Sequence, residues 1–280
     1  MRMSAQGSVR GPVAVVCALE EELVHLRGPL GAARAAREEW RDGRAYWHVA
    51  LDGLPVVLVR CGIGMVGAAA ATEALVIHQR PAAILNYGCT GAHREDLLPG
   101  DLVLGARMVA YDGVRVGPDG REYYAGMRYL RDGAQRKADY LPADPELLAA
   151  AQRAAERLEG RHEPWPVASG WPAATPRRAA RLLAGTVASA DRWNQAHARI
   201  RALAGLHESL CEDMEAAAIA LVCASHAVPF LTIKDISNNE LLHATDFAHF
   251  DTATAGELGR RAAALTLATL RELAAPPRTD

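Results

Sequence analysis

Residues 211–238 have the sequence CEDMEAAAIALVCASHAVPFLTIKDISN, in which acidic residues precede an apolar helix and an apolar strand follows it. Residues 216–222 carry no polar side chain, so a helix there is expected to be buried on all sides rather than on one face. The strand ends in the polar run 236–238, and ligands of open α/β sheets lie at the carboxyl ends of the strands. This stretch therefore predicts an α/β fold with a ligand site at one end of the sheet.

Two interpretations of the acidic residues ahead of this helix stay open. Asp213 and Glu215 lie where free backbone N–H groups and the helix dipole favour carboxylates, so each can be a helix cap. A buried carboxylate is also unfavourable unless it is paired. A carboxylate beside so apolar a helix therefore indicates that the carboxylate has a ligand to bind.

The chain is long enough for one large α/β domain or two small ones. It has 280 residues, 50% of them hydrophobic, and its prolines and glycines are dispersed rather than gathered in a linker. We therefore expect one domain over residues 13–273, with flexible ends at 1–12 and 274–280. The alternation of strand and helix patterns favours a mainly parallel sheet flanked by helices.

Local patterns place the elements of this sheet. Besides the strand that ends at 238, the expected strands are 13–17, 46–51, 55–61, 83–87, 101–110 and 186–189. The expected helices are 20–27, 66–79, 145–158, 195–206 and 254–273. Residues 111–143 lack clean periodicity and are expected to form an extended excursion with a hairpin at 118–120, and 163–176 are expected to cross the surface.

Charge and cysteine content exclude several classes of protein. A net charge of −2 gives no electrostatic case for a nucleic acid or an anionic membrane as partner. No apolar stretch precedes residue 12, and none approaches the ~20 residues that span a bilayer, so we expect a cytoplasmic protein without a signal peptide. The five cysteines form no paired motif and the ten histidines lack metal-ligand spacing. We therefore expect reduced cysteines, no metal site and no cofactor.

The segment from Gly62 to Gly67 matches the G-x-G-x-x-G pattern of dinucleotide sites, between an expected strand and an expected helix. That fingerprint also requires an acid at the end of the next strand, about 20 residues on, to bind the ribose. The next strand ends in NYGCTG, residues 86–91, which contains no acid. We therefore interpret the glycines as a place where the backbone approaches a ligand closely, and not as a dinucleotide site.

Together these segments resemble the nucleoside phosphorylase and nucleosidase family. Its signature is a Met-Glu pair that opens a buried helix, here residues 214–215, followed by a strand that ends Ile-Ser-Asp, here 236–238. The turn at 62–64 and the small-residue loop at 88–91 also match the family pattern. The resemblance implies a single-domain nucleoside phosphorylase-like α/β fold and a homodimer or larger homo-oligomer.

The resemblance also implies roles for individual residues. The run 17–22 is similar to a segment of the methylthioadenosine/S-adenosylhomocysteine nucleosidases whose third glutamate activates water, and that position here is Glu22. Residues 188–194 resemble a turn whose aromatic ring stacks on the purine, which makes Trp193 the stacking residue. Glu215 would bind the ribose hydroxyls. The other implied substrate-binding residues are Gly64, Cys89, Thr90, Asn194, Asp213, Met214 and Ser237.

Each of these motifs also has a simpler interpretation. Three successive acids in a first helical turn are often surface charge that complements the helix dipole. A tryptophan at a strand end, such as Trp193, is often ordinary core packing. Several motifs nevertheless occur in the family order, each at or beside the carboxyl end of an expected strand, which favours a site.

The strand that ends at 238 departs from the family pattern at its last residue. Where the nucleosidases have an aspartate that protonates N7 of the purine, this chain has Asn238, which can donate a hydrogen bond but cannot transfer a proton at neutral pH. Asparagine at this place is found in relatives that act on 6-oxopurines, and futalosine hydrolases release a base of that kind. The resemblance therefore implies a 6-oxopurine or an activated base. Asp235 would lie on the opposite face of a regular strand and is not expected to replace the acid.

The predicted function is hydrolysis of the N-glycosidic bond of a purine nucleoside, either methylthioadenosine-like or 6-oxopurine, with Glu22 and Asn238 as catalytic residues. One alternative is a phosphorylase, although Cys89 replaces the family's phosphate-binding serine and Asn86 an arginine. Arg60 and Arg94 lie near enough in the sequence to keep an anion site open. The other alternative is a protein that binds nucleosides without cleaving them.

Overall fold

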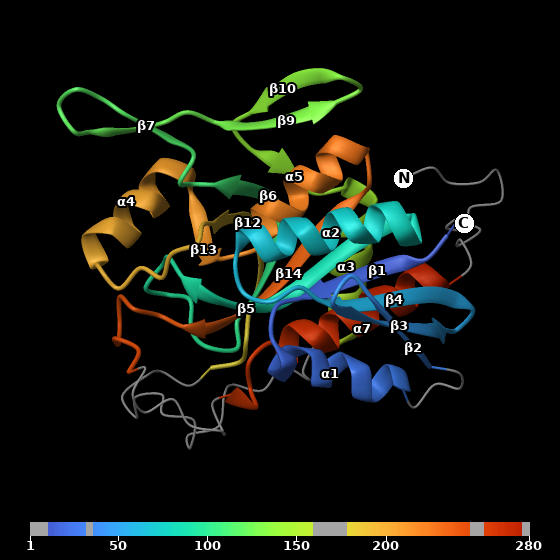
Figure 1. The fold of residues 1–280 in the computed structure, drawn as a ribbon. Helices are drawn as coiled ribbons and strands as arrows, with labels where there is room; N and C mark the ends of the chain where they lie inside the picture. The colour runs from blue at the N-terminus through green and yellow to red at the C-terminus, as the bar shows by residue number, and fades with distance from the viewer. Residues whose placement is uncertain (1–10, 32–35, 159–177, 247–254, 276–280) are drawn as a thin grey trace.

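The computed structural model describes residues 11–31, 36–158, 178–246 and 255–275, which form one α/β domain (Figure 1). The central sheet contains β1 (Val13–Cys17), β2 (Arg37–Arg41), β3 (Arg44–Leu51), β4 (Leu54–Arg60), β5 (Ala83–Ala92), β6 (Leu102–Ala110), β11 (Leu141–Pro142), β12 (Leu182–Ser189), β13 (Ser209–Asp213) and β14 (Phe230–Asn238). The helices of the described residues are α1 (Glu20–Gly31), α2 (Met65–Gln79), α3 (Pro145–Arg157), α4 (His197–His207), α5 (Ala216–His226) and α7 (Arg260–Ala274).

Five strands of the sheet form a closed ring. β5 pairs with β14 in parallel, β14 with β6 in antiparallel orientation, and β6 with β12 in parallel. β12 pairs in parallel with β13, which returns to β5 through an antiparallel pairing. Beyond β5 the sheet continues through β1, β4, β3 and β2. The expected mixed, mostly parallel sheet is therefore confirmed, and the ring brings the ends of β5, β12, β13 and β14 together.

Helices cover both faces of the sheet. Ala14 and Val16 of β1 belong to one apolar core with residues of α2 and α5, whereas Val13 and Val15 belong to a second core with residues of α1, α3 and α7. Figure 1 shows α2 and α5 on one side of the sheet and α1 and α7 on the other. This arrangement explains why residues 13–17 are apolar without alternation, because both faces of the strand are buried.

The excursion after β6 consists of two hairpins. β7 (Val114–Val116) pairs with β8 (Glu122–Tyr124) around the predicted turn, and β9 (Met127–Arg131) pairs with β10 (Ala134–Ala138). Both hairpins lie at the top of Figure 1, where β9 packs over α5. The sequence predicted only the first hairpin, because residues 127–138 alternate too weakly between apolar and polar side chains.

Several boundaries differ from the sequence prediction. α1 continues through Pro29 to Gly31, and β5 continues to Ala92 instead of ending at residue 87. The charged edge strand β2 and the short strand β13 were not predicted. The last helix runs over Arg260–Ala274 with Gly259 as its N-cap, so it begins later than the predicted residue 254, because residues 256–259 form a turn. The stretch 163–176 and most of both predicted flexible ends lie outside the described residues.

None of the described helices is both long enough and apolar enough to cross a membrane.

Candidate active site

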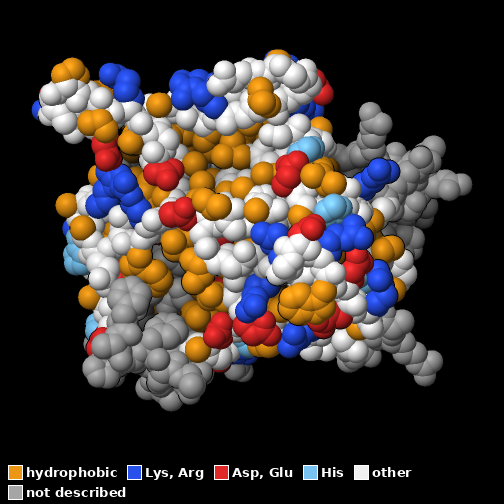
Figure 2. All heavy atoms as spheres, viewed as in Figure 1, with side chains coloured by type: hydrophobic (Ala, Val, Ile, Leu, Met, Phe, Trp, Pro, Cys, Tyr) orange, Lys and Arg blue, Asp and Glu red, His pale blue; other side chains and the backbone are white. Residues whose placement is uncertain are grey.

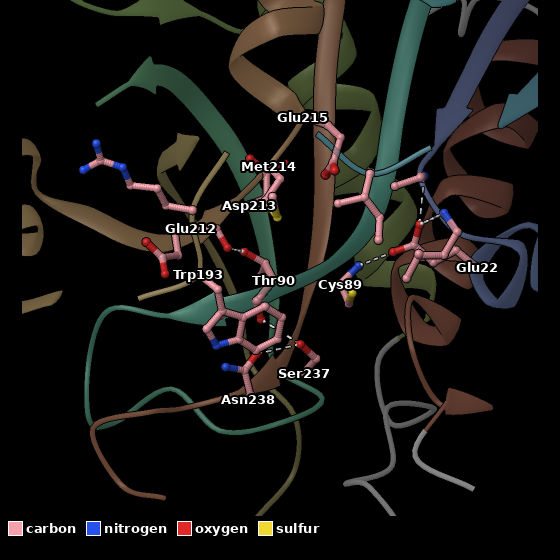
Figure 3. A pocket seen from close by; sticks show the side chains of 15 residues that line it. Glu22, Cys89, Thr90, Trp193, Glu212, Asp213, Met214, Glu215, Ser237 and Asn238 are labelled. Carbon is pink, nitrogen blue, oxygen red and sulfur yellow. Dashed lines mark hydrogen bonds between the residues drawn. The ribbon is translucent and has the colours of Figure 1, made fainter. Parts of the chain in front are cut away.

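A cavity of about 160 Å³ lies where β1, β5, β12, β13 and β14 end. Figure 3 shows Glu22 at one side of this cavity and Trp193 and Asn238 at the other. The residues that line it are Ala18, Leu19, Glu22, Ile63, Cys89, Thr90, Gly91, Arg192, Trp193, Glu212, Asp213, Met214, Glu215, Ser237 and Asn238.

The carboxylate of Glu22 is fixed by three backbone N–H groups. Oε2 accepts hydrogen bonds from Ala18 at 3.0 Å and Leu19 at 3.1 Å, and Oε1 accepts one from Cys89 at 2.8 Å. Gly88 permits this approach, because a Cβ there would lie 2.5 Å from Oε1 of Glu22. Glu22 is only 2% exposed. Since a carboxylate has about four lone-pair positions, one position on Oε1 stays free for a further donor such as water.

Glu215 binds to the N-terminus of α2 and not to its own helix. It precedes α5 without making a side-chain cap bond, and its Oε1 accepts a hydrogen bond from the Gly64 N–H at 2.9 Å. The next N–H of the same turn, that of Met65, donates to Asp191 at 2.6 Å. A helix N-terminus is an anion site because its first N–H groups lack partners within the helix. The glycine-rich turn thus binds two of the protein's own carboxylates.

Asp213 is the residue that caps α5. Its Oδ2 accepts a hydrogen bond from the Ala216 N–H at 3.0 Å and lies 2.8 Å from Nζ of Lys234, while Oδ1 accepts one from the Ser189 hydroxyl at 2.5 Å. Of the two interpretations of these acids, capping therefore applies to Asp213. The carboxylate of Glu215 makes its contact elsewhere and lines the cavity.

The charge state of Glu215 depends on this surrounding. Burial and, to a lesser extent, the neighbouring Asp213 carboxylate raise the pKa of Glu215 to about 7, against the opposing effects of Lys234 and the Gly64 N–H. Burial also disfavours the charge on Lys234, but Asp213, Glu215 and Glu22 hold the pKa of Lys234 above its usual value. Glu215 is therefore present in both protonation states near neutral pH.

An aromatic ring and an amide lie together at the other side of the cavity. Trp193 is 47% exposed, and its Nε1 donates to Oε1 of Glu240 at 3.2 Å. The same oxygen accepts a hydrogen bond from Nδ2 of Asn238 at 3.0 Å, and Oδ1 of Asn238 accepts one from the Ser237 hydroxyl at 2.9 Å. A flat ring beside donor and acceptor groups suits a planar heterocyclic ligand.

Ser237 and Asn238 both reach this cavity because β14 is irregular at its end. The register with β5 shifts between Ile236 and Asn238, which is the mark of a β-bulge. A regular strand would have turned neighbouring side chains to opposite faces.

Glu212 is a pocket carboxylate that the sequence did not single out. Its two oxygens accept hydrogen bonds from the Asn194 backbone N–H at 3.1 Å and the Asn194 side-chain amide at 2.6 Å, and Oε2 also accepts one from the Tyr111 hydroxyl at 3.3 Å. These bonds fix the loop that carries Trp193. The only signal in the sequence was the position of Glu212 beside Asp213.

Asp235 lies outside the cavity lining and caps α7. Its carboxylate accepts hydrogen bonds from the backbone N–H groups of Gly259 at 3.2 Å, Arg261 at 2.9 Å and Ala262 at 3.2 Å. Burial raises the pKa of Asp235 to about 7. The turn that Asp235 holds also contacts Glu22, because a Cβ on Gly259 would lie 2.8 Å from Cγ of Glu22.

The arginines that kept an anion site open do not line the cavity. Arg60 is paired with Glu20 at 3.3 Å, and Arg94 with Asp96 at 2.8 Å. Arg192 is the cationic side chain among the lining residues.

Two further residues of the anion-site hypothesis have structural partners. Asn86 is 1% exposed, donates to the Val16 carbonyl at 3.0 Å and accepts a hydrogen bond from the Thr232 hydroxyl at 2.7 Å. Burial raises the pKa of the Cys89 thiol well above its usual value, and the neighbouring Glu22 carboxylate raises it further. Cys89 is therefore a neutral thiol at physiological pH.

Nine of the eleven residues predicted for the site line this cavity. Gly64 and Asn194 do not, because Gly64 contacts Glu215 through its backbone and Asn194 faces Glu212. Across the described ranges, no group of three or more His, Cys, Asp or Glu side chains is placed to hold a metal ion.

Comparison with known proteins places this architecture in a family. The model of the phosphorylase superfamily matches residues 12–271, so the chain belongs to the phosphorylase superfamily. The 5'-methylthioadenosine/S-adenosylhomocysteine nucleosidase of Treponema pallidum (strain Nichols) is 31% identical over 281 residues, with 94% of each chain covered. The enzyme of the same name from Geobacillus kaustophilus (strain HTA426) is 31% identical over 233 residues, covering 80% of this chain and 83% of the relative.

Solved structures give the same fold. A methylthioadenosine/S-adenosylhomocysteine nucleosidase from S. pneumoniae, solved with a transition-state inhibitor, superposes with a TM-score of 0.71 at 25% identity and covers 94% of this chain and 99% of its own. Futalosine hydrolase of Helicobacter pylori strain 26695 has a TM-score of 0.74 at 18% identity, covering 94% of this chain and 98% of its own. The nucleoside phosphorylase-like fold expected from the sequence is thereby confirmed.

Proposed function

We propose that this protein is a purine nucleosidase, which hydrolyses the N-glycosidic bond of a methylthioadenosine-like or 6-oxopurine nucleoside. The observation that carries the proposal is that Glu22 and Glu215 line one cavity with Trp193 and Asn238 at its other side. The similarity to nucleosidases over most of both chains supports this chemistry.

The ribose would lie between the two carboxylates. Cleavage of the N-glycosidic bond gives the ribose positive charge in the transition state, as in glycoside hydrolysis. Ionised Glu215 accepts hydrogen bonds from the ribose hydroxyls and stabilises that charge. Glu22 takes a proton from the water whose oxygen attacks the anomeric carbon, through the lone pair that its backbone donors leave free.

The base would lie against Trp193. As the bond from the anomeric carbon to N9 breaks, its electron pair passes to the base. Asn238 donates a hydrogen bond to N7 and so stabilises the charge on the leaving base. Since an amide does not transfer a proton, the base takes its proton from solvent. This favours a base that leaves readily without an acid, and is the reason why a 6-oxopurine remains among the proposed substrates.

The arrangement of Glu22 favours water over phosphate as the attacking group. The N–H groups of Ala18, Leu19 and Cys89 converge in the corner where an oxyanion would otherwise bind, and the Glu22 carboxylate already accepts all three. A phosphate in this corner would find the Glu22 carboxylate in place of free N–H donors, and the negative charges of the phosphate and the carboxylate would repel each other.

A nucleoside-binding protein without activity is the second candidate. The observation that favours it is the amide of Asn238, because the site offers no carboxylic acid at the end of β14 to protonate the base.

One assay separates these functions. Methylthioadenosine, S-adenosylhomocysteine, adenosine, inosine and futalosine are each incubated with the protein, with and without phosphate, and the free base and sugar are measured. We expect free base and unphosphorylated sugar without phosphate. Base release that requires phosphate would establish a phosphorylase, and saturable binding without base release would establish a binding protein.

We further propose that the protein is a homo-oligomer, as the family resemblance implies. Figure 2 shows apolar side chains in the region between the two hairpins and the helices below them. A groove between β9 and α5 is lined by Tyr129, Leu141, Cys223, Val228 and Phe230, among others. Sedimentation of a monomer at micromolar concentration would contradict this proposal.

A further inference from the structure

Glu240 follows Asn238 by two residues and is almost completely buried, although it does not line the cavity. Its Oε1 accepts hydrogen bonds from Nδ2 of Asn238 at 3.0 Å, from Nε1 of Trp193 at 3.2 Å and from the Thr245 hydroxyl. Its Oε2 accepts one from the Thr245 backbone N–H at 2.9 Å and one from Gln195 at 3.3 Å. One carboxylate oxygen therefore contacts both groups that would hold the base.

The contact with Glu240 decides which way the amide of Asn238 is turned. An ionised carboxylate only accepts hydrogen bonds, so the NH₂ group of the amide must face Glu240, and an amide oxygen there would be repelled. On the other side, the single hydrogen of the Ser237 hydroxyl is shared between Oδ1 of Asn238 at 2.9 Å and the Thr90 carbonyl at 3.2 Å. Burial opposes the charge on Glu240, but the hydrogen bonds from Thr245, Trp193 and Gln195 hold the pKa of Glu240 below its usual value. The carboxylate is thus ionised throughout the neutral range.

With both ends of the amide held, Asn238 has one N–H left for a ligand. An amide NH₂ carries two hydrogens, and one of them is bound to Glu240. The Trp193 indole donates to the same Oε1 of Glu240, so the distance and orientation between the Asn238 amide and the Trp193 ring are fixed. A hydrogen bond to a leaving group contributes to catalysis only if its donor is already oriented when charge develops there.

We propose that Glu240 is a positioning residue, which orients Asn238 so that its free N–H faces N7 of the purine and ties that donor to the Trp193 ring. This inference rests on the proposed nucleosidase function. Glu240 would act through Asn238 and Trp193, without itself contacting the substrate.

Two substrates separate this role from a structural one. One is the purine nucleoside that the wild type cleaves fastest, and the other is p-nitrophenyl riboside, whose leaving group has no N7 and departs without a donor. Both use Glu22 and Glu215, so activity on p-nitrophenyl riboside reports the amount of correctly folded protein. The variants are Glu240→Ala and the nearly isosteric Glu240→Gln. Gln195→Ala is the control, because it removes a donor to Oε2 and leaves the donors to Oε1 in place.

For Glu240→Ala we expect kcat on the purine nucleoside to fall by about 10–100-fold relative to kcat on p-nitrophenyl riboside, the size of effect typical for loss of one oriented hydrogen bond in a transition state. Glu240→Gln keeps one acceptor oxygen, so the fall in the same ratio should be smaller. Gln195→Ala should keep the ratio of the two activities within about twofold. Equal losses on both substrates, or no loss on either, would overturn the positioning role, and the ratio stays readable even if a variant is partly unfolded. A wild type that cleaves p-nitrophenyl riboside and no purine nucleoside would overturn the proposed function itself.

Discussion

The backbone N–H of Cys89 lies 2.8 Å from Oε1 of Glu22, which joins the end of β5 to the first turn of α1. The bond gives one residue two functions in the site. The Glu22 carboxylate occupies the Cys89 N–H, which would otherwise attract an oxyanion, and the same bond holds that carboxylate at the cavity wall. In the proposed function, the preference for water over phosphate would thus depend on a contact between residues 67 positions apart.

Glu22→Gln should lower turnover by about 10²–10⁴-fold, because the amide cannot take a proton from water. The amide oxygen of Gln can still accept from the Ala18 and Leu19 N–H groups while the bond from Cys89 is lost, so the fold should survive, which circular dichroism can check. Glu21→Gln is the matched control, since Glu21 is exposed and belongs to the same acidic run. Similar kinetics in the two variants would mean that the whole run is surface charge.

Activity should depend on the ionisation of Glu215. Because its pKa is raised to about 7, kcat/KM is expected to fall about tenfold per pH unit below pH 7, as the carboxylate that stabilises the ribose cation becomes protonated. Lys234 acts to lower that pKa, so Lys234→Met should move this acidic limb to higher pH. The measurement is kcat/KM from pH 5 to 9. A limb that does not move in Lys234→Met would assign it to another group.

The same carboxylate should make the protein less stable as pH rises. A group whose pKa is raised by folding stabilises the folded state below its unfolded pKa, near 4.5, and that contribution is lost as pH rises to about 7. Glu215→Gln removes the titration. The Tm of the variant minus the Tm of the wild type should therefore be larger at pH 8 than at pH 5. About 2–4 °C in Tm per kcal/mol is the expected scale.

The comparison between the two proteins isolates Glu215. Asp235 also has a raised pKa of about 7, but it is present in both proteins and cancels in the difference. A difference in Tm that stays constant with pH would contradict the assignment of the raised pKa to Glu215.

Asn238→Asp should raise activity on 6-aminopurine nucleosides by about tenfold or more. The new carboxyl would replace an amide nitrogen that lies 3.0 Å from Glu240, and two carboxyls so close share a proton, which raises one of their pKa values. That proton is then available for N7, a role that Asn238 cannot perform. Base release from methylthioadenosine and inosine, measured for both proteins, tests the change.

The wild type is expected to cleave inosine or an activated nucleoside faster than methylthioadenosine. In the double variant Asn238→Asp/Glu240→Gln the gain on methylthioadenosine should shrink, because the charge that raises the new pKa is gone. Rapid cleavage of methylthioadenosine by the wild type, with no gain in Asn238→Asp, would show that another group protonates the base.

The sequence predicted those parts of the fold that depend on local composition. Residues 13–17 and 216–222 carry no polar side chain, and the structure buries all of them except Leu221 and Val222, which are half-buried. β2 and β13 were not predicted, because their sequences lack such a continuous apolar pattern. The sequence of β2 is REEWR, which only pairing with β3 makes a strand, and β13 is a five-residue link of the closed ring. β2 forms a local hairpin with β3 and was concealed by its charged sequence, whereas β13 depends on pairing with the distant strands β12 and β5, which a local pattern does not contain.

Site residues could be predicted where they belong to a motif beside a strand end. They could not be predicted where their role depends on a hydrogen-bond partner that is distant in the sequence. Glu22, Trp193 and Asn238 were predicted from motifs, and the structure brings them to one cavity. Glu212 and Glu240 were missed because their partners, Asn194 and Trp193 among them, come next to them only in the folded chain. The β-bulge that turns both Ser237 and Asn238 to the cavity was likewise invisible to a rule of strict alternation.

The contact of Gly259 with Glu22 has a consequence for biosynthesis. A ribosome delivers Glu22 long before the turn capped by Asp235 that packs against it. A nascent chain that has already formed β1 and α1 therefore still lacks one wall around the Glu22 carboxylate. That wall is added only when the turn at Gly259 docks, so folding of β1 and α1 alone would not complete the surroundings of Glu22.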